Sequence, residues 1–452
     1  MELYELTAAQ AAEQIRRREL SPVELVEALL KRIDALEPDL LAWETVDREG
    51  ALTAARKCEA QAGKEGAGPL LGVPLGVKDI FYTAGLRTTS GSPLYRDFVP
   101  DHDATSVARL REAGAVILGK TVTVQFAHFD PPPTRNPWNR DRTPGGSSSG
   151  SAAAVAARMA PAALGSQTGG SVLRPSAYCG VVGIKPSYGR VSRHGVMPAS
   201  WSLDHVGALA RSVEDAALLL QAMAGHDPMD AASARVPVGD YVGAARRKDR
   251  APSIGFVPDN LENAQPEVAA HVKEMAARLE RAGAMVREVH FPVPMQALLA
   301  IRSVIGEVEA AGLHANNLRD HPEGYASHIR AQVEVGQLVP GFAYIQAQRL
   351  RRELRPRVER MLDGIDVLLM PSTSDVAPDP STTGRNHFQA SWSLFGFPSI
   401  TLPSGLSRER LPLAVQLVAG PFQEEALLSC AAWCEAELGP MPAPDLPWVV
   451  RH

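Results

Sequence analysis

Between residues 69 and 210, glycine and proline divide the chain into short apolar runs, and this pattern limits the possible folds more than any other feature. The runs GVPLGVKDIF, AVILGK and VVGIKP predict buried strands, whereas ATSVARLREAG and SAAAVAARMA predict the helices between them. Strands that alternate with helices form a sheet covered on both faces. We therefore predict an α/β fold with one large mixed, mainly parallel β-sheet that has helices on both faces.

The flanking regions add helices to this sheet. Capping signals, with Ser21 before Pro22 as the clearest, start two helices in an N-terminal helical layer over residues 1–65, and the second helix is expected to end before Pro38. Residues 295–362 are mostly helical, and the strand pattern then returns in DVLLMP, FPSITLP and LPLAVQLVAG. We predict a single domain over residues 1–452, with a catalytic core at 69–210 and a helical insertion at 295–362 that shapes the pocket.

A lysine inside an apolar strand is the first candidate for chemistry. Lys78 lies in GVPLGVKDIF, and a buried lysine is costly unless it is paired or neutral. Burial lowers the pKa of the amine, and a neutral amine can act as a base. A salt bridge to Asp79 or to another acid is the alternative. Adjacent strand residues point to opposite faces, however, so Asp79 is a poor partner.

The stretch PGGSSSGSAAAVAARM, residues 144–159, places serines directly before an alanine-rich helix. Its composition also fits a flexible linker. The start of a helix, however, directs N–H groups and hydroxyls at one point, which suits an anion or a polarised carbonyl. The segment Gly146–Gly150 also matches G-x-S-x-G, the nucleophile elbow of α/β-hydrolases. That motif needs a strand just before the serine, and PPPTRNPWNRDRTP cannot be a central strand.

A second glycine-containing stretch is ALGSQTGGSVLRPSAYCG, residues 163–180. Gly169 and Gly170 before Ser171 allow a sharp backbone turn that leaves N–H groups free on one side. An oxyanion hole can be built from the main chain in this way. An ordinary tight turn between two strands is the alternative.

These three segments, in this order, resemble the amidase signature family, and the resemblance extends to LPLAVQLVAGPFQEEALL near the C-terminus. It implies that Ser171 is the nucleophile, that Ser147 is a proton relay on a cis Gly146–Ser147 bond, and that Lys78 is the base. It also implies an oxyanion loop made of Thr168, Gly169, Gly170 and Ser171. Such an enzyme needs no histidine, because neutral Lys78 draws a proton from Ser147, which draws one from Ser171. The expected reaction is hydrolysis of a carboxamide C–N bond through an acyl-enzyme, with release of ammonia.

Two residues near the nucleophile bear on the substrate. Glutamine-hydrolysing subunits of tRNA-dependent amidotransferases, which belong to the same family, read Asp-Thr-Gly-Gly-Ser-Ile-Arg at this point. This chain has Gln167 in place of the acid, and its arginine is Arg174, three residues after the serine. The variant resembles members that act on malonamate and biuret-type compounds, in which the matching arginine holds the substrate carboxylate. We therefore expect Arg174 and Gln167 to contact a small polar or acidic amide. For Arg174, the alternative role is pairing with a structural carboxylate or with loop carbonyls. For the protein, the alternative function is that of a glutamine-hydrolysing amidotransferase subunit.

Further pocket residues are proposed from the same resemblance. Ala127 is expected to line the pocket through its backbone, and His128 either contacts substrate or packs as a hydrogen-bonded histidine. Three polar residues of the helical insertion, Glu307, Glu309 and His314, are expected at the surface.

Composition limits the partners. A formal charge of −5 gives no reason to expect nucleic acid or an anionic membrane as a partner. The charged N-terminus does not resemble a signal peptide, and no uncharged apolar stretch is long enough to cross a bilayer. Four scattered cysteines predict free buried thiols and a cytoplasmic protein. Without metal-ligand spacing or a phosphate loop, we expect neither metal nor nucleotide cofactor. The resemblance implies a homodimer.

Overall fold

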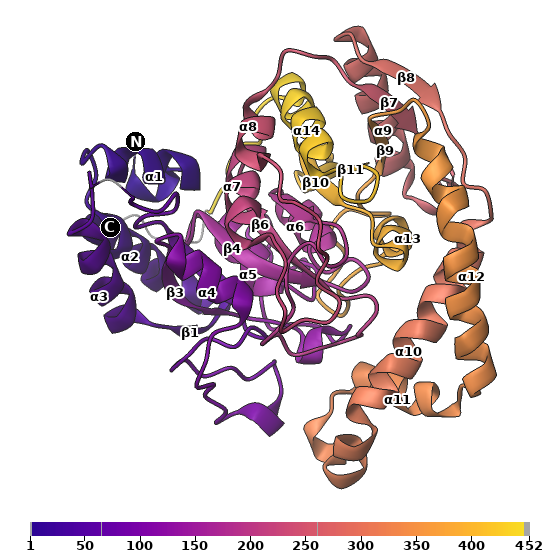
Figure 1. Cartoon of the computed structure of the whole chain (residues 1–452), viewed down its shortest axis with the longest axis horizontal. Coiled ribbons are helices and arrows are strands. Elements are labelled where there is room, and N and C mark those ends of the chain that lie inside the picture. The colour runs from indigo at the N-terminus through magenta and orange to yellow at the C-terminus, as the bar shows by residue number, and fades with distance from the viewer. Residues whose placement is uncertain (1, 65, 260, 447–452) are drawn as a thin grey trace.

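The computed structural model describes residues 2–64, 66–259 and 261–446 (Figure 1). Its described strands form one 11-stranded sheet in the order β1-β3-β2-β4-β6-β5-β10-β11-β9-β7-β8. The strand bounds are β1 Trp43–Val46, β2 Pro74–Lys78, β3 Val116–Thr121, β4 Ala162–Gln167, β5 Val182–Lys185, β6 His205–Ala210, β7 Ser253–Phe256, β8 Met285–Glu288, β9 Val367–Pro371, β10 Ser399–Leu406 and β11 Pro412–Val418.

The sheet is mixed, as predicted, but the expectation of mainly parallel strands is wrong. Only β2 with β3 and β4, and β7 with β8 and β9, pair in parallel. The six other neighbour pairs of described strands are antiparallel. Two connections without a crossover helix account for four of these antiparallel pairs, those of β6 with β4 and β5 and those of β11 with β9 and β10, since a parallel pair needs such a crossover. Residues 186–204 return the chain to β6 between β4 and β5, and residues 407–411 close the β10–β11 hairpin.

Helices cover both faces of the sheet, as predicted. One face is covered by α4 Thr105–Glu112, α7 Val213–Met223, α8 Tyr241–Arg246, α9 Pro266–Arg281 and α14 Glu424–Leu438, with α1 Ala8–Arg16 against α7. The other face is covered by α2 Pro22–Leu40, α3 Arg48–Glu59, α5 Ser149–Ala156, α6 Leu173–Cys179 and α13 His387–Phe395. The apolar side chains of successive strand residues alternate between these two layers, as the two-residue strand period requires.

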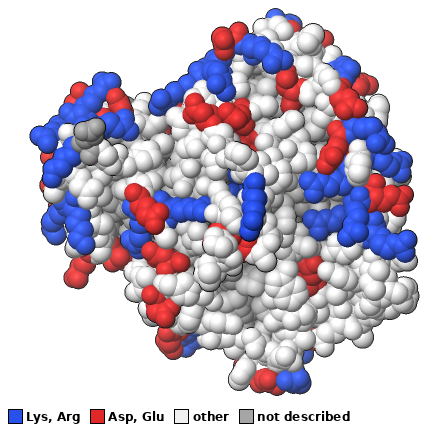
Figure 2. Space-filling view, in the orientation of Figure 1, with Lys and Arg blue, Asp and Glu red and all other residues white. Residues whose placement is uncertain are grey.

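The helical insertion consists of α10 Met295–Asp320, α11 Ser327–Leu338 and α12 Gly341–Glu359. In Figure 1 these three helices lie at the opposite end of the molecule from α1–α3, with the sheet between them. Helix α12 carries five arginines, and Figure 2 shows blue side chains gathered where α12 lies, interspersed with acidic ones. The insertion packs on α13 through α10 and thereby reaches the sheet.

In the N-terminal helical layer, the predicted start of the second helix is confirmed, but its predicted end is wrong. Thr7 and Gln10 form a reciprocal capping box at the start of α1. Helix α2 starts after Ser21, as predicted, but it continues through Pro38 to Leu40. A proline in the last turn removes only one N–H donor. The end of the helix is held instead by buried Leu40 and by the following turn, in which the Glu37 carboxylate accepts from two backbone N–H groups.

All four cysteines are buried and free, as predicted. No helix in the described part of the chain is both long and apolar enough to cross a membrane. Within the same ranges, no three His, Cys, Asp or Glu side chains converge on a position that could hold a metal ion.

A buried ion pair next to the predicted base gives a stability prediction. The Lys120 ammonium lies 3.1 Å from the Asp79 carboxylate, and both side chains are at most 1% exposed. Asp79→Ala leaves Lys120 buried without its partner, so we expect it to lower the free energy of unfolding by about 3–5 kcal/mol. The measurement is urea unfolding. Glu334→Ala, which breaks an exposed pair with Arg330, is the control and should cost about 1 kcal/mol or less. Equal losses in the two variants would contradict the prediction.

Candidate active site

Lys78 ends strand β2 and is fully buried. Its Nζ lies 2.8 Å from the Ser147 hydroxyl and 2.8 Å from the Ser166 hydroxyl. No carboxylate in the described part of the chain lies within 4.0 Å of this amine, because Asp79 points to the other side and pairs with Lys120. Burial lowers the pKa of Lys78 well below its ordinary value; the charge of Asp204 raises it and that of Arg174 lowers it further. A neutral amine is therefore favoured at this position.

Ser147 precedes helix α5 and is also fully buried. The Gly146–Ser147 peptide bond is cis, as the resemblance implied. Residues 131–146 contain no strand, so the nucleophile-elbow interpretation of Gly146–Gly150 does not fit. Helix α5 follows directly and has no cap bond from a side chain. The linker alternative is excluded as well, because the stretch is buried inside the domain.

Ser171 lies in the turn between β4 and α6 and is 5% exposed. This turn approaches the start of α5, where Ser148 N–H donates to the Ser171 carbonyl at 3.3 Å. In the described residues the Ser171 hydroxyl has no hydrogen bond to that of Ser147, so only the first step of the predicted relay, from Lys78 to Ser147, is a formed hydrogen bond. Such bonds often tighten only when substrate is bound.

The predicted oxyanion loop has free donors. The backbone N–H groups of Gly169, Gly170 and Ser171 have no acceptor among the described residues. Neither glycine has a positive φ, so they are not needed for an unusual backbone conformation. Glycine is needed at position 169 because a side chain has no room there: a Cβ would lie 2.6 Å from the Asn386 amide nitrogen. The loop is packed tightly enough to hold its N–H groups in place.

Thr168 and Asp204 fix the start of this loop. The Thr168 hydroxyl donates to the Asp204 carboxylate at 2.5 Å. Asp204 also accepts from the N–H groups of Ala199 and Ser200, at 2.8 and 3.0 Å. Burial raises the pKa of Asp204, while these hydrogen bonds lower it. Asp204 is thus a support for the oxyanion loop, a role that the sequence alone did not indicate.

Two polar residues of the insertion are buried rather than exposed, so their predicted surface positions are wrong. The Glu309 carboxylate accepts from the hydroxyls of Ser200, Ser202 and Tyr344 and from Ser202 N–H. His314 packs against Phe126, and burial lowers its pKa to about 4. Both side chains find partners outside α10, which allows polar groups to be buried. The third residue, Glu307, is partly exposed.

Arg174 and Gln167 do not take the substrate-facing positions that were expected. The Arg174 guanidinium donates to the carbonyls of Gly146 and Gly384, both at 2.7 Å, which is the loop-carbonyl alternative. The Gln167 amide accepts from Val172 and Leu173 N–H and donates to Ser393, so it holds the start of α6. Both side chains are at most 1% exposed, and neither lines a cavity described below. The two terminal nitrogens of the Arg174 guanidinium and the side-chain amide of Gln167 are therefore used inside the protein.

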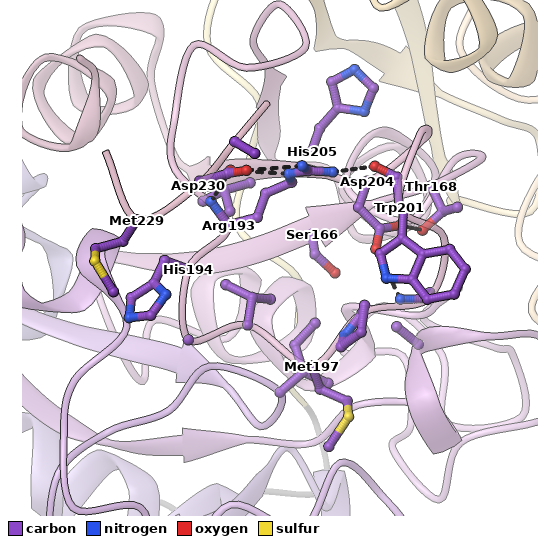
Figure 3. Close-up of a pocket in the computed structure, with 18 residues that line it drawn as sticks. Ser166, Thr168, Arg193, His194, Met197, Trp201, Asp204, His205, Met229 and Asp230 are labelled. Carbon is purple, nitrogen blue, oxygen red and sulfur yellow. Dashed lines mark hydrogen bonds and ion pairs between the residues drawn. The ribbon is translucent and has the colours of Figure 1, made fainter. Parts of the chain in front are cut away.

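Two cavities meet at the site and share a wall made by Ala127, Thr168 and Ala199. The larger one has a volume of about 290 Å³ and is lined by Ser166. Figure 3 shows Ser166 near its centre, with Thr168, Asp204 and Trp201 towards one end and His194 and Met229 towards the other. The smaller one is lined by Ser171 and has about 10 Å³, roughly the space of one water molecule. Ser171 therefore faces a narrow space that adjoins a wider cavity.

Ala127 and His128 lie at this narrow space, as expected. Ala127 has φ 62°, a left-handed conformation that is uncommon outside glycine and that places its backbone on the shared wall. His128 Nδ1 is hydrogen-bonded to the Gln332 side-chain oxygen at 2.8 Å, and burial lowers the pKa of His128 to about 3. His128 is thus both a hydrogen-bonded packing residue and part of the pocket lining.

The sequence analysis did not identify three residues of the site. They are Ser166, which contacts Lys78, Asp204, which supports the loop, and Arg302 on α10, which lines the narrow cavity. Ser166 lies only five residues before Ser171, so proximity to the motif was a usable signal. Arg302 gave none, because it comes from a helix far along the chain.

A buried lysine next to a serine hydroxyl, with a second serine in a loop of free N–H groups, defines a site suited to acyl transfer. The Amidase family model matches residues 24–428, and the chain belongs to the amidase signature family. It is therefore an amidase-family enzyme that acts on carbon–nitrogen bonds.

The similar proteins align with nearly the whole chain. It is 38% identical to one subunit of the glutamyl-tRNA(Gln) amidotransferase of Geobacter sp. (strain M21), over 97% of this chain and 98% of that one. A solved chain from a vestigial protein complex related to the origins of an s-triazine catabolic enzyme has a TM-score of 0.91 and 32% identity, with coverage of 97% and 100%. The native peptide amidase of Stenotrophomonas maltophilia has a TM-score of 0.86 and 32% identity, with coverage of 98% and 99%.

The pKa of Lys78 gives a pH prediction. Because a base must be unprotonated and burial lowers this pKa, we expect kcat/KM to rise with pH and to level off well below about 10.4, the ordinary lysine value. The measurement is a pH–rate profile, with unfolding followed over the same range as a control. A chemistry-limited rate that is constant between about pH 5 and 9 would contradict the predicted rise and count heavily against a lysine base.

Ser166 gives a second prediction. Ser166→Ala removes one of the two hydroxyl partners of Lys78, so we expect a loss of about tenfold in kcat and a pH profile moved to lower pH, since the protonated amine loses an acceptor. Ser147→Ala removes the hydroxyl predicted to be the proton relay and should lower kcat by about 10³-fold or more. Steady-state kinetics of both variants are the measurement. An unshifted profile in Ser166→Ala would show that this serine does not act through Lys78.

Proposed function

We propose that the protein hydrolyses a primary carboxamide through an acyl-enzyme on Ser171 and releases ammonia. The observation that carries this proposal is the fully buried Lys78 amine, which is hydrogen-bonded to Ser147 and has no carboxylate partner in the described residues. An amine held neutral by burial can remove a proton, whereas a salt-bridged ammonium cannot.

The proposed reaction has two halves. As the Ser171 oxygen attacks the carbonyl carbon, its proton passes to Ser147, and the Ser147 proton passes to Lys78. The resulting oxyanion accepts hydrogen bonds from the free N–H groups of the loop at 169–171. The C–N bond then breaks, the relay returns the proton to the leaving nitrogen, and ammonia departs. Water attacks the ester by the same relay, giving a carboxylic acid and free Ser171.

Two substrates are candidates. A small polar or acidic amide of the malonamate or biuret type is the first, and the narrow cavity at Ser171 favours a short acyl group. Glutamine, hydrolysed by one chain of a tRNA-dependent amidotransferase, is the second. The names of the curated relatives support the second more directly than the first, because these relatives are amidotransferase subunits with 36–40% identity. Gln167 in place of the acid supports the first.

The quaternary state is proposed along with the substrate. A self-sufficient hydrolase is expected to act as a homodimer in the cytoplasm, whereas an amidotransferase subunit requires partner chains.

The test is an ammonia-release screen over malonamate, biuret, carboxylated biuret, glutamine, short fatty amides and aryl amides. We expect the isolated chain to release ammonia from at least one of them, and Ser171→Ala to lose about 10³-fold or more. Hydroxylamine trapping should give a hydroxamate from the acyl-enzyme. Glutaminase activity that appears only with partner proteins would assign the second candidate. A fully active Ser171→Ala variant would disprove the mechanism.

A further inference from the structure

A second buried arginine lies beside the nucleophile. Arg302 is on helix α10, is 7% exposed, and lines the narrow cavity together with Thr168, Gly169 and Ser171. Unlike Arg174, its guanidinium donates to no carbonyl. Among the described residues it has neither a hydrogen bond nor a carboxylate within 4.0 Å, and its Nε is buried without a partner. Burying a cation without a partner costs free energy, so a buried arginine in this position is expected to bind a counter-ion.

The described residues around the Arg302 guanidinium provide no hydrogen-bond acceptor and leave space beside it. A Cβ on Gly169 would lie 3.1 Å from Arg302 Nη2, closer than an ordinary contact. Gly306, one turn further along α10, faces the same group, since its Cβ would lie 3.6 Å from Cζ and Nη1. On a third side the Phe129 ring centroid is 5.8 Å from Cζ. Two glycines and an aromatic ring therefore hold the guanidinium without using its N–H donors.

The nearby acids Glu307 and Asp204 do not pair with the Arg302 guanidinium. Glu307 and Asp204 act on the pKa of Arg302 only through space, and burial is the larger effect, lowering that pKa. Asp204 already accepts hydrogen bonds from Thr168, Ala199 and Ser200. Glu307 is partly exposed and forms no ion pair with Arg302. The partner that fits an open guanidinium is an oxyanion, which it can bind with two parallel hydrogen bonds.

We propose that Arg302 binds a carboxylate at the end of the substrate's acyl group, so that the enzyme acts on carboxamides whose acyl chain is short and anionic. This inference rests on the proposed function and specifies its substrate class. The carboxylate lies a few bonds from the scissile carbonyl, because Arg302 and Ser171 line the same small cavity. The proposed contact applies to malonamate-like amides and also to glutamine, whose acyl group has a carboxylate beside its ammonium group. It excludes fatty and aryl amides, which lack a carboxylate, as good substrates.

The test compares matched acidic and neutral substrates. Malonamate carries a carboxylate where malonamide carries a second carboxamide of nearly the same shape. We expect the wild type to prefer malonamate, and Arg302→Gln to lower kcat/KM for malonamate by about 10- to 100-fold, mainly through KM, with less than about fivefold change for malonamide. Arg302→Lys keeps the charge but not the paired hydrogen bonds, so its loss on malonamate should be intermediate.

Two controls separate this role from a structural one. Arg319→Gln removes an exposed arginine from the same helix and should change neither substrate. Arg174→Ala, which removes donors to Gly146 and Gly384, should lower activity on both substrates alike. Malonate should inhibit wild-type hydrolysis of malonamide, and Arg302→Gln should weaken that inhibition by about tenfold or more. Thermal unfolding checks that each variant folds.

The outcomes distinguish this inference from the proposed function. Equal losses on malonamate and malonamide, or a wild type that prefers malonamide and is not inhibited by malonate, would overturn the role of Arg302. Ammonia release that depends on Ser171 would in that case still support the proposed function. If no amide in the screen is cleaved in a Ser171-dependent way, the proposed function itself fails.

Discussion

The site depends on one constraint, the full burial of a lysine that is denied a carboxylate partner. Strand alternation sends Asp79 away from Lys78, and the β2–β3 register places Lys120 where it neutralises that acid. Lys78 is left with two serine hydroxyls as its nearest partners, one from the start of α5 and one from β4. Burial then favours the neutral amine. Two adjacent residues, Lys78 at the end of β2 and Asp79 just after it, thus have opposite surroundings: Asp79 is ion-paired, and Lys78 is the buried amine proposed as the base.

The oxyanion loop is held from a distance by a continuous series of hydrogen bonds. Glu309 on α10 binds the segment at residues 200–202, that segment and Ala199 donate to Asp204, and Asp204 binds Thr168. The helical insertion is therefore connected to the turn that carries Ser171, and the same helix brings Arg302 to the narrow cavity.

The two arginines show how far sequence reasoning reaches within the site. Arg174 lies in the recognisable motif, yet its donors are used by the carbonyls of Gly146 and Gly384. Arg302 lies outside any motif, yet it is the guanidinium left open beside Ser171. A motif fixes which residues are neighbours along the chain. Whether a side chain faces a pocket or a carbonyl depends on groups from other elements, and those cannot be seen in the motif.

The sequence by itself determined strands β2, β3 and β5, helices α4 and α5, the mixed sheet with helices on both faces, the family, and the candidate residues Lys78, Ser147 and Ser171. Each of these follows from local periodicity or from short segments with a specific spacing. Strands β4 and β6 and helix α6, in the same part of the chain, were not predicted. Only the tertiary structure decided the strand directions, the burial of Glu309 and His314, the partners Ser166 and Asp204, and the fact that carbonyls accept from Arg174 while Arg302 donates to none in the described residues. The physical reason is that burial and hydrogen-bond satisfaction are set by segments distant in sequence. A polar residue on a helix is exposed or buried according to what packs against it, and α10 packs against α13 and binds the loop before β6.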